Sequence, residues 1–377
     1  MDNIFNYRGI AQDIHFVGRE TEIKKLSSDF IFLTNAAIIA PQGWGKSSLV
    51  HQAAKVASHK EKSLRFAYVD LSNVRNEERF FELLVQGVLK AVSSSQKDVL
   101  DNVGKYFTEI HPKISFDSDS AESLNVDFDW EAIRKNQDFL LDFPSQVAKD
   151  KGVKMIVCID DFHVISQFAD PESLLDGFKA RWSRQDGVSY CVCAAALAMV
   201  EKFISSTPIF YRYGDILRLD KIPVKEMSAY IRERFAECAK YLDIETASYI
   251  AELVDCHPLY TQQLAHQSYL AAAVVCSKEV IAKAHETMVD QMGLVFENLT
   301  ASLTTQQLCY LHAVLAGETV ISTSEVLFRH HISSATSASR SKTALLERGI
   351  ICNIDGKISM ADPIYASWLK NRYFAKK

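Results

Sequence analysis

Three features that often define the class of a protein are scarce in this chain of 377 residues. No stretch reaches the ~20 apolar residues that a membrane-spanning helix needs, so we expect no membrane span. Basic residues are outnumbered, because 42 Lys and Arg face 47 Asp and Glu. The net charge of −5 argues against a surface built throughout to bind polyanions, although one module could still be locally basic. The eight cysteines include no C-x-x-C pair, so we expect neither a zinc site nor a disulfide framework.

The remaining composition is typical of a globular protein with several domains. Hydrophobic residues make up 48% of the chain and charged residues 24%, which are ordinary values for folded proteins. The length suggests two or three domains. The N-terminal sequence has no basic segment followed by an apolar run, so we expect a cytoplasmic location.

Two apolar features invite other interpretations, which we set aside. Cys158, Cys191 and Cys193 lie in strand-like apolar runs, where cysteine behaves as a small hydrophobic residue. The alanine-rich stretch 270–275 is far too short to cross a membrane, and we predict that it lies in a core.

One segment, residues 38–48, predicts a specific chemistry. An apolar strand runs into a loop that ends in Gly-Lys-Ser and then into a helix, which is nearly a Walker A phosphate loop. Such a loop turns backbone N–H groups toward phosphate, places a lysine on the terminal phosphates and a hydroxyl on Mg²⁺, and has a helix N-terminus behind it. A glycine-rich turn that caps a helix is the alternative. The expected ATP- or ADP-binding residues are Gln42, Gly43, Trp44, Gly45, Lys46, Ser47 and Ser48, with Ser47 also a Mg²⁺ ligand.

The loop departs from the Walker A pattern at its first position, where Ala40 replaces glycine. Alanine costs most where φ must be positive. The turn from strand to loop can instead use ordinary dihedral angles, while Gly43 remains free to take the unusual ones.

Strand-like runs alternate with helical spacing through the first 222 residues. The strands are predicted at 36–40, 64–70, 153–160, 188–196 and 216–219. This alternation predicts an α/β fold, in which a mainly parallel sheet is covered by helices on both faces and ligands bind beyond the carboxyl ends of the strands. Residues 93–130 have weak periodicity, clustered serines and many acids, so we predict a surface insertion there.

The rest of the chain predicts two helical modules. Residues 223–297 show only helical spacing and are predicted to form a helical lid domain. Residues 298–377 contain three predicted helices followed by two alternating strands around an Asp-Gly turn, which is the outline of a winged helix.

Asp160 and Asp161 end an apolar strand about a hundred residues after the loop, where a phosphate-loop NTPase places its Walker B acids. The first carboxylate would hold Mg²⁺ through water and the second would polarise the attacking water. Many such ATPases carry Asp-Glu, and the shorter Asp161 would move the base by about a methylene group. A solvated strand end is the alternative.

These motifs together resemble a known family. The segment Phe16-Val17-Gly18-Arg19-Glu20, the Walker A loop, the two Walker B acids and residues 206–212 before a strand are similar to the prokaryotic "archaeal-type" ATPases of the STAND group, relatives of AAA+ and ORC/Cdc6-like proteins. Residues 362–369 resemble the segment that closes the winged helix of that family. The resemblance covers most of the chain and is weakest in the acidic insertion.

The resemblance implies roles for further residues. Phe16, Val17, Gly18 and Arg19 would line the adenine pocket, and Arg212 would stabilise γ-phosphate charge or form a structural salt bridge. His257 and Pro258 resemble the start of the lid helix that packs near the base; a helix N-terminal residue without a ligand role is the alternative for His257. The expected catalytic set is Lys46, Asp160, Asp161 and Arg212, with Mg²⁺ on Ser47 and Asp160.

Three departures predict weak catalysis. Ala40 replaces glycine, Asp161 replaces glutamate, and Cys193-Ala194-Ala195-Ala196 offers no polar group where relatives often place one at the end of the fourth strand. We therefore expect an ATP-binding switch of the AAA+/STAND kind with slow Mg²⁺-dependent hydrolysis, which acts on a protein partner or a second copy of itself.

Two other functions stay open. The first is a DNA-binding adaptor with a degenerate nucleotide site, for which Arg340 and Lys342 on the third winged-helix helix are the candidate contacts. The second is a motor, which would need a reliable trans arginine, and Arg212 is only a partial candidate.

Overall fold

The computed structural model describes residues 4–108, 110–118, 120–133, 138–182, 184–195, 214–354 and 356–376. Backbone contacts divide the chain into two compact units. The helical unit comprises residues 1–19, 40–48 and 219–377, and the sheet unit comprises residues 20–39 and 49–218. The Walker A loop therefore belongs to the helical unit.

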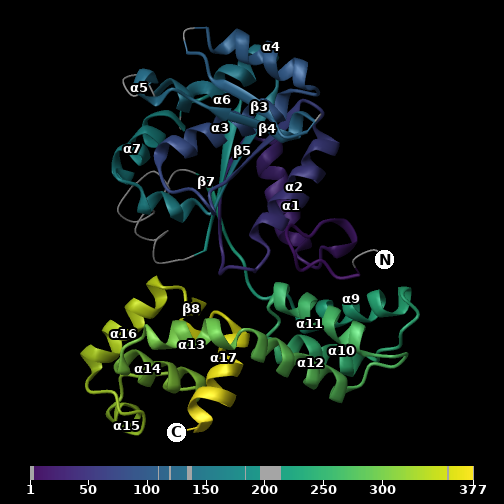
Figure 1. The fold of residues 1–377 in the computed structure, drawn as a ribbon, viewed down its shortest axis with the longest axis vertical. Helices are drawn as coiled ribbons and strands as arrows, with labels where there is room; N and C mark the ends of the chain where they lie inside the picture. Colours follow the sequence, from purple (N-terminus) through teal and green to yellow (C-terminus); the bar gives the residue numbers. More distant parts are fainter. Residues whose placement is uncertain are drawn as a thin grey trace. The chain divides into compact units, whose positions relative to one another are not determined.

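A five-stranded parallel sheet forms the centre of the sheet unit (Figure 1). Its strand order is β2-β5-β6-β1-β7. The continuous apolar run at 153–160 becomes a strand that is buried over all but its first residue, as expected for a parallel strand covered on both faces. The predicted α/β fold with a parallel sheet is confirmed. The strands are β1 (Asn35–Ile39), β2 (Leu64–Asp70), β5 (Lys154–Asp160), β6 (Val188–Ala194) and β7 (Gly214–Arg218).

Helices cover both faces of this sheet. Side chains of α3, α6 and α7 pack with Ala67, Val157 and Tyr190 on one face. On the other face, Phe30 of α1 and His51 of α2 contact the ring of Phe66 at centroid distances of 6.5 and 5.3 Å. The helices are α1 (Glu20–Ile31), α2 (Lys46–Lys60), α3 (Glu77–Val92), α4 (Gln96–Tyr106), α5 (Trp130–Ile133), α6 (Asp138–Lys151) and α7 (Pro171–Trp182), with short helical turns η2 (Ala121–Ser123) and η3 (Phe162–Gln167).

The segment 93–130 differs from the predicted surface insertion. It contains α4 and an antiparallel hairpin of β3 (Lys113–Phe116) and β4 (Leu124–Asp127). Val99, Leu124 and Val126 are buried in the core of the sheet unit, because these few apolar residues face inward between exposed serines and acids. The prediction was wrong in treating the whole segment as surface.

The helical unit contains the lid helices, the winged helix and a hydrophobic core that runs through both. Helix α13 spans the boundary predicted at residues 297 and 298, so the division into two domains stays a prediction. The elements are α9 (Val224–Glu237), α10 (Ile244–Leu253), α11 (Pro258–Ala271), α12 (Lys278–Gln291), α13 (Gly293–Ala301), α14 (Thr305–Leu315), α15 (Ser324–Arg329), α16 (Ala335–Glu347), β8 (Ile351–Ile354), β9 (Lys357–Met360) and α17 (Pro363–Trp368), with turns η1 (Asp13–His15), η4 (Leu369–Tyr373) and η5 (Phe374–Lys376).

The alanine-rich stretch 270–275 is only partly core. Ala272 is buried, but Leu270, Val274 and Val275 are 64%, 64% and 59% exposed. The prediction was wrong for these three residues because α11 already ends at Ala271. None of the helices in the described ranges is long and apolar enough to cross a bilayer.

Candidate functional site: the Walker loop and its surroundings

The Walker A loop has the backbone that its glycines predict. Gly43 and Gly45 adopt φ values of +77° and +84°, and Ala40 takes no positive φ. Helix α2 begins at Lys46, whose buried Nζ donates hydrogen bonds to the carbonyl oxygens of Ala40 (2.9 Å) and Pro41 (3.1 Å). The loop therefore holds a lysine charge inside its curve and places Ser47 in the first turn of a helix.

Arg19 ties this loop to the segment just before the lid. Its guanidinium Nη2 donates hydrogen bonds to the carbonyl oxygens of Trp44 (3.2 Å) and Asp220 (2.8 Å). Val17 packs with Ile222 and with lid residues that include Met227, and Gly18 has a φ of +65°. The structure thus brings the Phe16–Arg19 segment, the loop and the lid together within the helical unit, and their predicted role as an adenine pocket stays a prediction.

Gly18 also lies close to the lid, because a Cβ at this position would overlap the carboxylate of Glu226. Ser48, predicted to bind nucleotide, accepts a hydrogen bond at Oγ from the backbone N–H of Ala11 (2.9 Å). This hydroxyl fastens the N-terminal segment to α2.

His257 connects the lid to the loop. It caps α11, where its Nδ1 accepts a hydrogen bond from the N–H of Tyr260 (3.4 Å), while its Nε2 lies 3.2 Å from the carbonyl oxygen of Gln42. One nitrogen must accept and the other must donate, so these partners assign the neutral Nε2–H tautomer. Burial lowers the pKa of His257 to about 4, which keeps the ring neutral at pH 7 although Asp362 opposes the shift. Pro258 is the first residue of α11.

The contact between His257 and the loop leaves no room for a side chain at Gly43. A Cβ there would lie 2.6 Å from Cε1 of His257. The indole of Trp44 also meets the His257 ring edge to face, with centroids 6.4 Å apart. The loop and the lid helix therefore fit each other closely.

Tyr260 continues this connection into the winged helix. Its hydroxyl donates to Oδ2 of Asp362 (2.7 Å), and Oδ1 of Asp362 accepts the N–H groups of Ile364 and Tyr365 at the start of α17. No sequence pattern pointed to the pair of Tyr260 and Asp362, which are 102 residues apart. A cavity of about 420 Å³ lies along this path, lined by loop residues 41–43, lid residues 257, 259 and 260, and winged-helix residues that include Arg348 and Tyr365.

The predicted Walker B acids lie in the sheet unit. Asp160 ends β5 and is 5% exposed; its Oδ2 accepts a hydrogen bond from the Tyr68 hydroxyl (2.6 Å) and its Oδ1 accepts one from the N–H of Asp161 (2.9 Å). Asp161 has a φ of +52°, in the left-handed region. Tyr68 was not predicted as a site residue; its position on β2, paired with Cys158, becomes visible only from the strand register.

The remaining predicted residues have mixed outcomes. Arg212 and Ala196 lie outside the described residues, and Cys193 and Ala194 end β6 as buried apolar side chains. On α16, Arg340 is exposed and Lys342 is partly exposed. Three neighbouring basic groups are engaged within the winged helix: Arg329 and His330 with Glu318, and Arg348 with Ser302.

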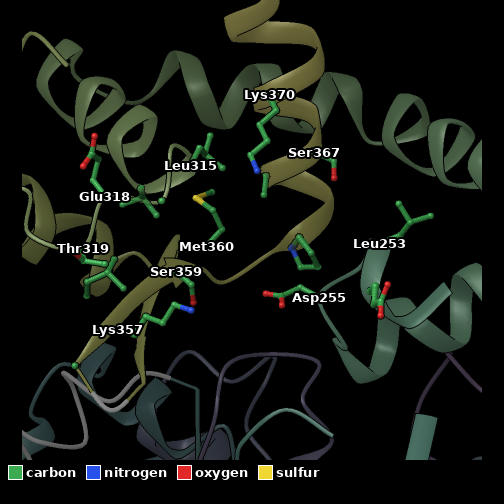
Figure 2. Close-up of a pocket in the computed structure, with 17 residues that line it drawn as sticks. Leu253, Asp255, Leu315, Glu318, Thr319, Lys357, Ser359, Met360, Ser367 and Lys370 are labelled. Carbon is green, nitrogen blue, oxygen red and sulfur yellow. The ribbon is translucent and has the colours of Figure 1, made fainter. Parts of the chain in front are cut away.

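A second cavity, of about 680 Å³, lies between the end of α10 and the winged helix (Figure 2). Figure 2 shows Lys357 of the hairpin and Lys370 after α17 on different sides of it, with Asp255 and Glu318 also in its wall. The mixed charges give this cavity no evident preference for an anion or a cation.

Comparisons with known proteins agree with this architecture. A family model described as a probable winged helix domain matches residues 294–371. The fold resembles the Walker-type ATPase PABY2304 of Pyrococcus abyssi, with a TM-score of 0.69, 14% identity, and coverage of 97% of this chain and 99% of that one. It also resembles the ORC2 protein of Aeropyrum pernix in ADPNP–ADP complexes, with a TM-score of 0.59, 13% identity, and coverage of 100% of this chain and 98% of that one. A third similar structure is Cdc6p of Pyrobaculum aerophilum, with a TM-score of 0.52, 13% identity, and coverage of 98% of this chain and 97% of that one. No curated protein matches by sequence. The predicted fold, a P-loop ATPase architecture with a C-terminal winged helix, is confirmed.

Proposed function

We propose that this protein is an ATP-binding switch of the AAA+/STAND kind, in which the winged helix responds to the nucleotide held by the Walker loop. The observation that carries the proposal is the joint geometry of Lys46 and His257. Lys46 places a buried cation within the loop, and His257 contacts the same loop from the lid. A bound phosphate would contact the lysine ammonium and the N-terminus of α2. If the phosphate moved residue 42, the hydrogen bond between its carbonyl oxygen and the His257 ring would change.

Mg²⁺ would be held by Ser47 and Asp160. β5 ends at Asp160 and β1 leads directly into the loop, as the spacing of the two Walker motifs predicts. Hydroxyl and carboxylate oxygens suit this hard cation, and Asp160 is already fixed by Tyr68 and by the N–H of Asp161. When bound, Mg²⁺ would neutralise charge that develops on the phosphates.

Hydrolysis would be slow. Asp161 has a shorter side chain than the usual glutamate, and its left-handed backbone fixes the direction of that side chain. Ala194 at the end of β6 has no group that could orient a water molecule. Asp161 would act as a weak base, with Lys46 and Arg212 as charge stabilisers.

The response would travel from residue 42 through His257 and Tyr260 to Asp362. Each step is a contact within the helical unit: a hydrogen bond to the loop, ring contact at a centroid distance of 4.7 Å, and a hydrogen bond to the cap of α17. The winged helix would then present a different surface to a protein partner or to a second copy of the chain.

Calorimetric titration with ATP and ADP in Mg²⁺, together with phosphate release, tests the site. We expect binding with slow turnover for the wild type, and binding weakened about 100-fold or more in Lys46→Ala, because a charge-assisted phosphate contact is lost. Circular dichroism checks that the variant folds. Wild-type affinity in Lys46→Ala, or no binding by the wild type at millimolar nucleotide, refutes the proposal.

A matched glycine pair tests the closeness of loop and lid. Gly43→Ala and Gly45→Ala both place alanine at positive φ, but only the Cβ of residue 43 meets His257; residue 45 has open space around it. We expect the larger loss of nucleotide affinity and stability in Gly43→Ala. Equal losses in the two variants would show that the lid contact has no influence.

DNA binding is the second candidate, favoured by the exposed Arg340 on α16 and by the winged-helix match. Under this alternative, duplex binding would depend on salt, fall in Arg340→Ala and Lys342→Ala, and ignore ATP. The engagement of Arg329, His330 and Arg348 inside the domain leaves few basic groups for phosphates, which makes the switch the better supported function.

A further inference from the structure

Three cysteines meet inside the sheet unit. Cys158 of β5 lies beside Cys191 of β6 in the strand register, and Cys193 follows two residues later on the same face of β6. The three Sγ atoms all lie within 4.8 Å of one another, and each cysteine is fully buried. Three thiolates around one cation at about 2.3 Å would be about 4 Å apart, so the cluster already has nearly the required size.

One polar group on the face of the thiols lacks a partner. Ser189, which shares the face of Cys191 on β6, is fully buried, and its hydroxyl has no hydrogen-bond partner in the described part of the chain. This part of the core is therefore not purely apolar packing.

We propose that Cys158, Cys191 and Cys193 bind a monovalent copper ion. Soft sulfur ligands select thiophilic cations such as Cu⁺. The described residues supply no fourth His, Cys, Asp or Glu to the cluster, whereas structural Zn²⁺ takes four ligands. Each sulfur that binds Cu⁺ would do so as a thiolate, so its proton would leave to water as the ion enters.

The strand register alone brings the three sulfur atoms together, so the proposal does not depend on nucleotide binding.

The test is a competition titration of the full chain, reduced and free of oxygen, against a colorimetric Cu⁺ chelator. Cys238, Cys309 and Cys352, which are partly exposed, are first replaced by serine to remove other thiol sites. We expect one Cu⁺ per chain, with an ultraviolet thiolate-to-copper absorption band. Failure to compete with the chelator, or binding of Zn²⁺ at these sulfurs without binding of Cu⁺, overturns the proposal.

Variants locate the ion. Cys193→Ala in the same background should weaken Cu⁺ binding at least 100-fold, whereas Cys276→Ala, which removes a buried thiol in the lid, should leave it unchanged. If Cys193→Ala fails to fold, X-ray absorption of the copper-loaded parent counts the ligands directly. Three sulfur neighbours support the site, and any other count overturns it.

Discussion

The two faces of the five-stranded sheet are built from different chemistry. The face under α3, α6 and α7 is apolar and aromatic: Phe178 stacks on Trp182 and Trp182 on Tyr190, each at a centroid distance of 4.2 Å. The face under α1 and α2 also has aromatic rings, those of Phe30 and Phe66, but it carries three thiols and the hydroxyl of Ser189 as well. Both faces are buried, so exposure alone does not distinguish them.

The difference shows that one sheet can place most of its aromatic stacking on one face and its thiol and carboxylate groups on the other. Close packing of large rings removes much apolar area from water, which stabilises the fold. The thiols and the hydroxyl of the other face gain less from burial, because polar atoms lose water there without full compensation. That face also holds Asp160, since residues 158 and 160 point to the same side of β5. The reactive groups therefore gather on one side of the sheet.

Truncation of the aromatic face should have the largest effect. Phe178→Ala should lower the free energy of unfolding by about 3–5 kcal/mol, because it leaves a cavity beside Trp182 and Phe80. Cys191→Ala on the other face should cost only about 1 kcal/mol, since a single sulfur atom is lost. Denaturant unfolding compares the two variants. Equal costs would contradict the contrast between the faces.

The buried carboxylate of the thiol face should make stability depend on pH. Burial raises the pKa of Asp29 to about 6, although Lys25, 3.9 Å away, opposes this. Between pH 4 and 6 the folded state then binds more protons than the unfolded state, so stability falls as pH rises through this window. We expect a loss of about 1–2 kcal/mol after allowing for solvent screening at the helix surface.

Asp29→Asn isolates this contribution, because asparagine keeps the shape and does not titrate. Urea unfolding of wild type and variant between pH 4 and 7 gives the comparison. The curve of the variant should be flatter across the window, and parallel curves would show that Asp29 has an ordinary pKa.

The hydroxyl of Tyr68 should have the smallest effect on stability and a more specific effect on the site. Tyr68→Phe removes the hydrogen bond to Asp160 and should cost about 1 kcal/mol of unfolding free energy. We also expect a several-fold weaker dependence of ATP binding on Mg²⁺, because Asp160 loses one of the groups that orient it. Tyr106→Phe, which removes a tyrosine hydrogen bond to Asp150 instead, is the control. Unchanged Mg²⁺ dependence in Tyr68→Phe would remove Tyr68 from the site.

Features within one stretch of sequence could be predicted, and features that depend on strand order could not. The apolar run at 153–160 indicated β5, and the spacing of Gly43, Gly45 and Lys46 indicated the loop, because each depends on local backbone requirements. In the cysteine cluster, Cys191 and Cys193 follow Cys158 by 33 and 35 positions. They meet because β5 and β6 are neighbouring strands, and no rule based on sequence spacing reveals that neighbourhood. Tyr260 and Asp362 meet only because lid and winged helix pack on one core.

That common core has a consequence for how the C-terminal half can move. Buried side chains from Tyr230 in the lid to Leu369 after α17 belong to one continuous cluster. A swing of the winged helix away from the lid would expose this cluster to water, at a cost comparable to partial unfolding. Amide hydrogens of the lid and of the winged helix should therefore exchange with deuterium as a single cooperative unit. We expect the lid and the winged helix to move together as one rigid body.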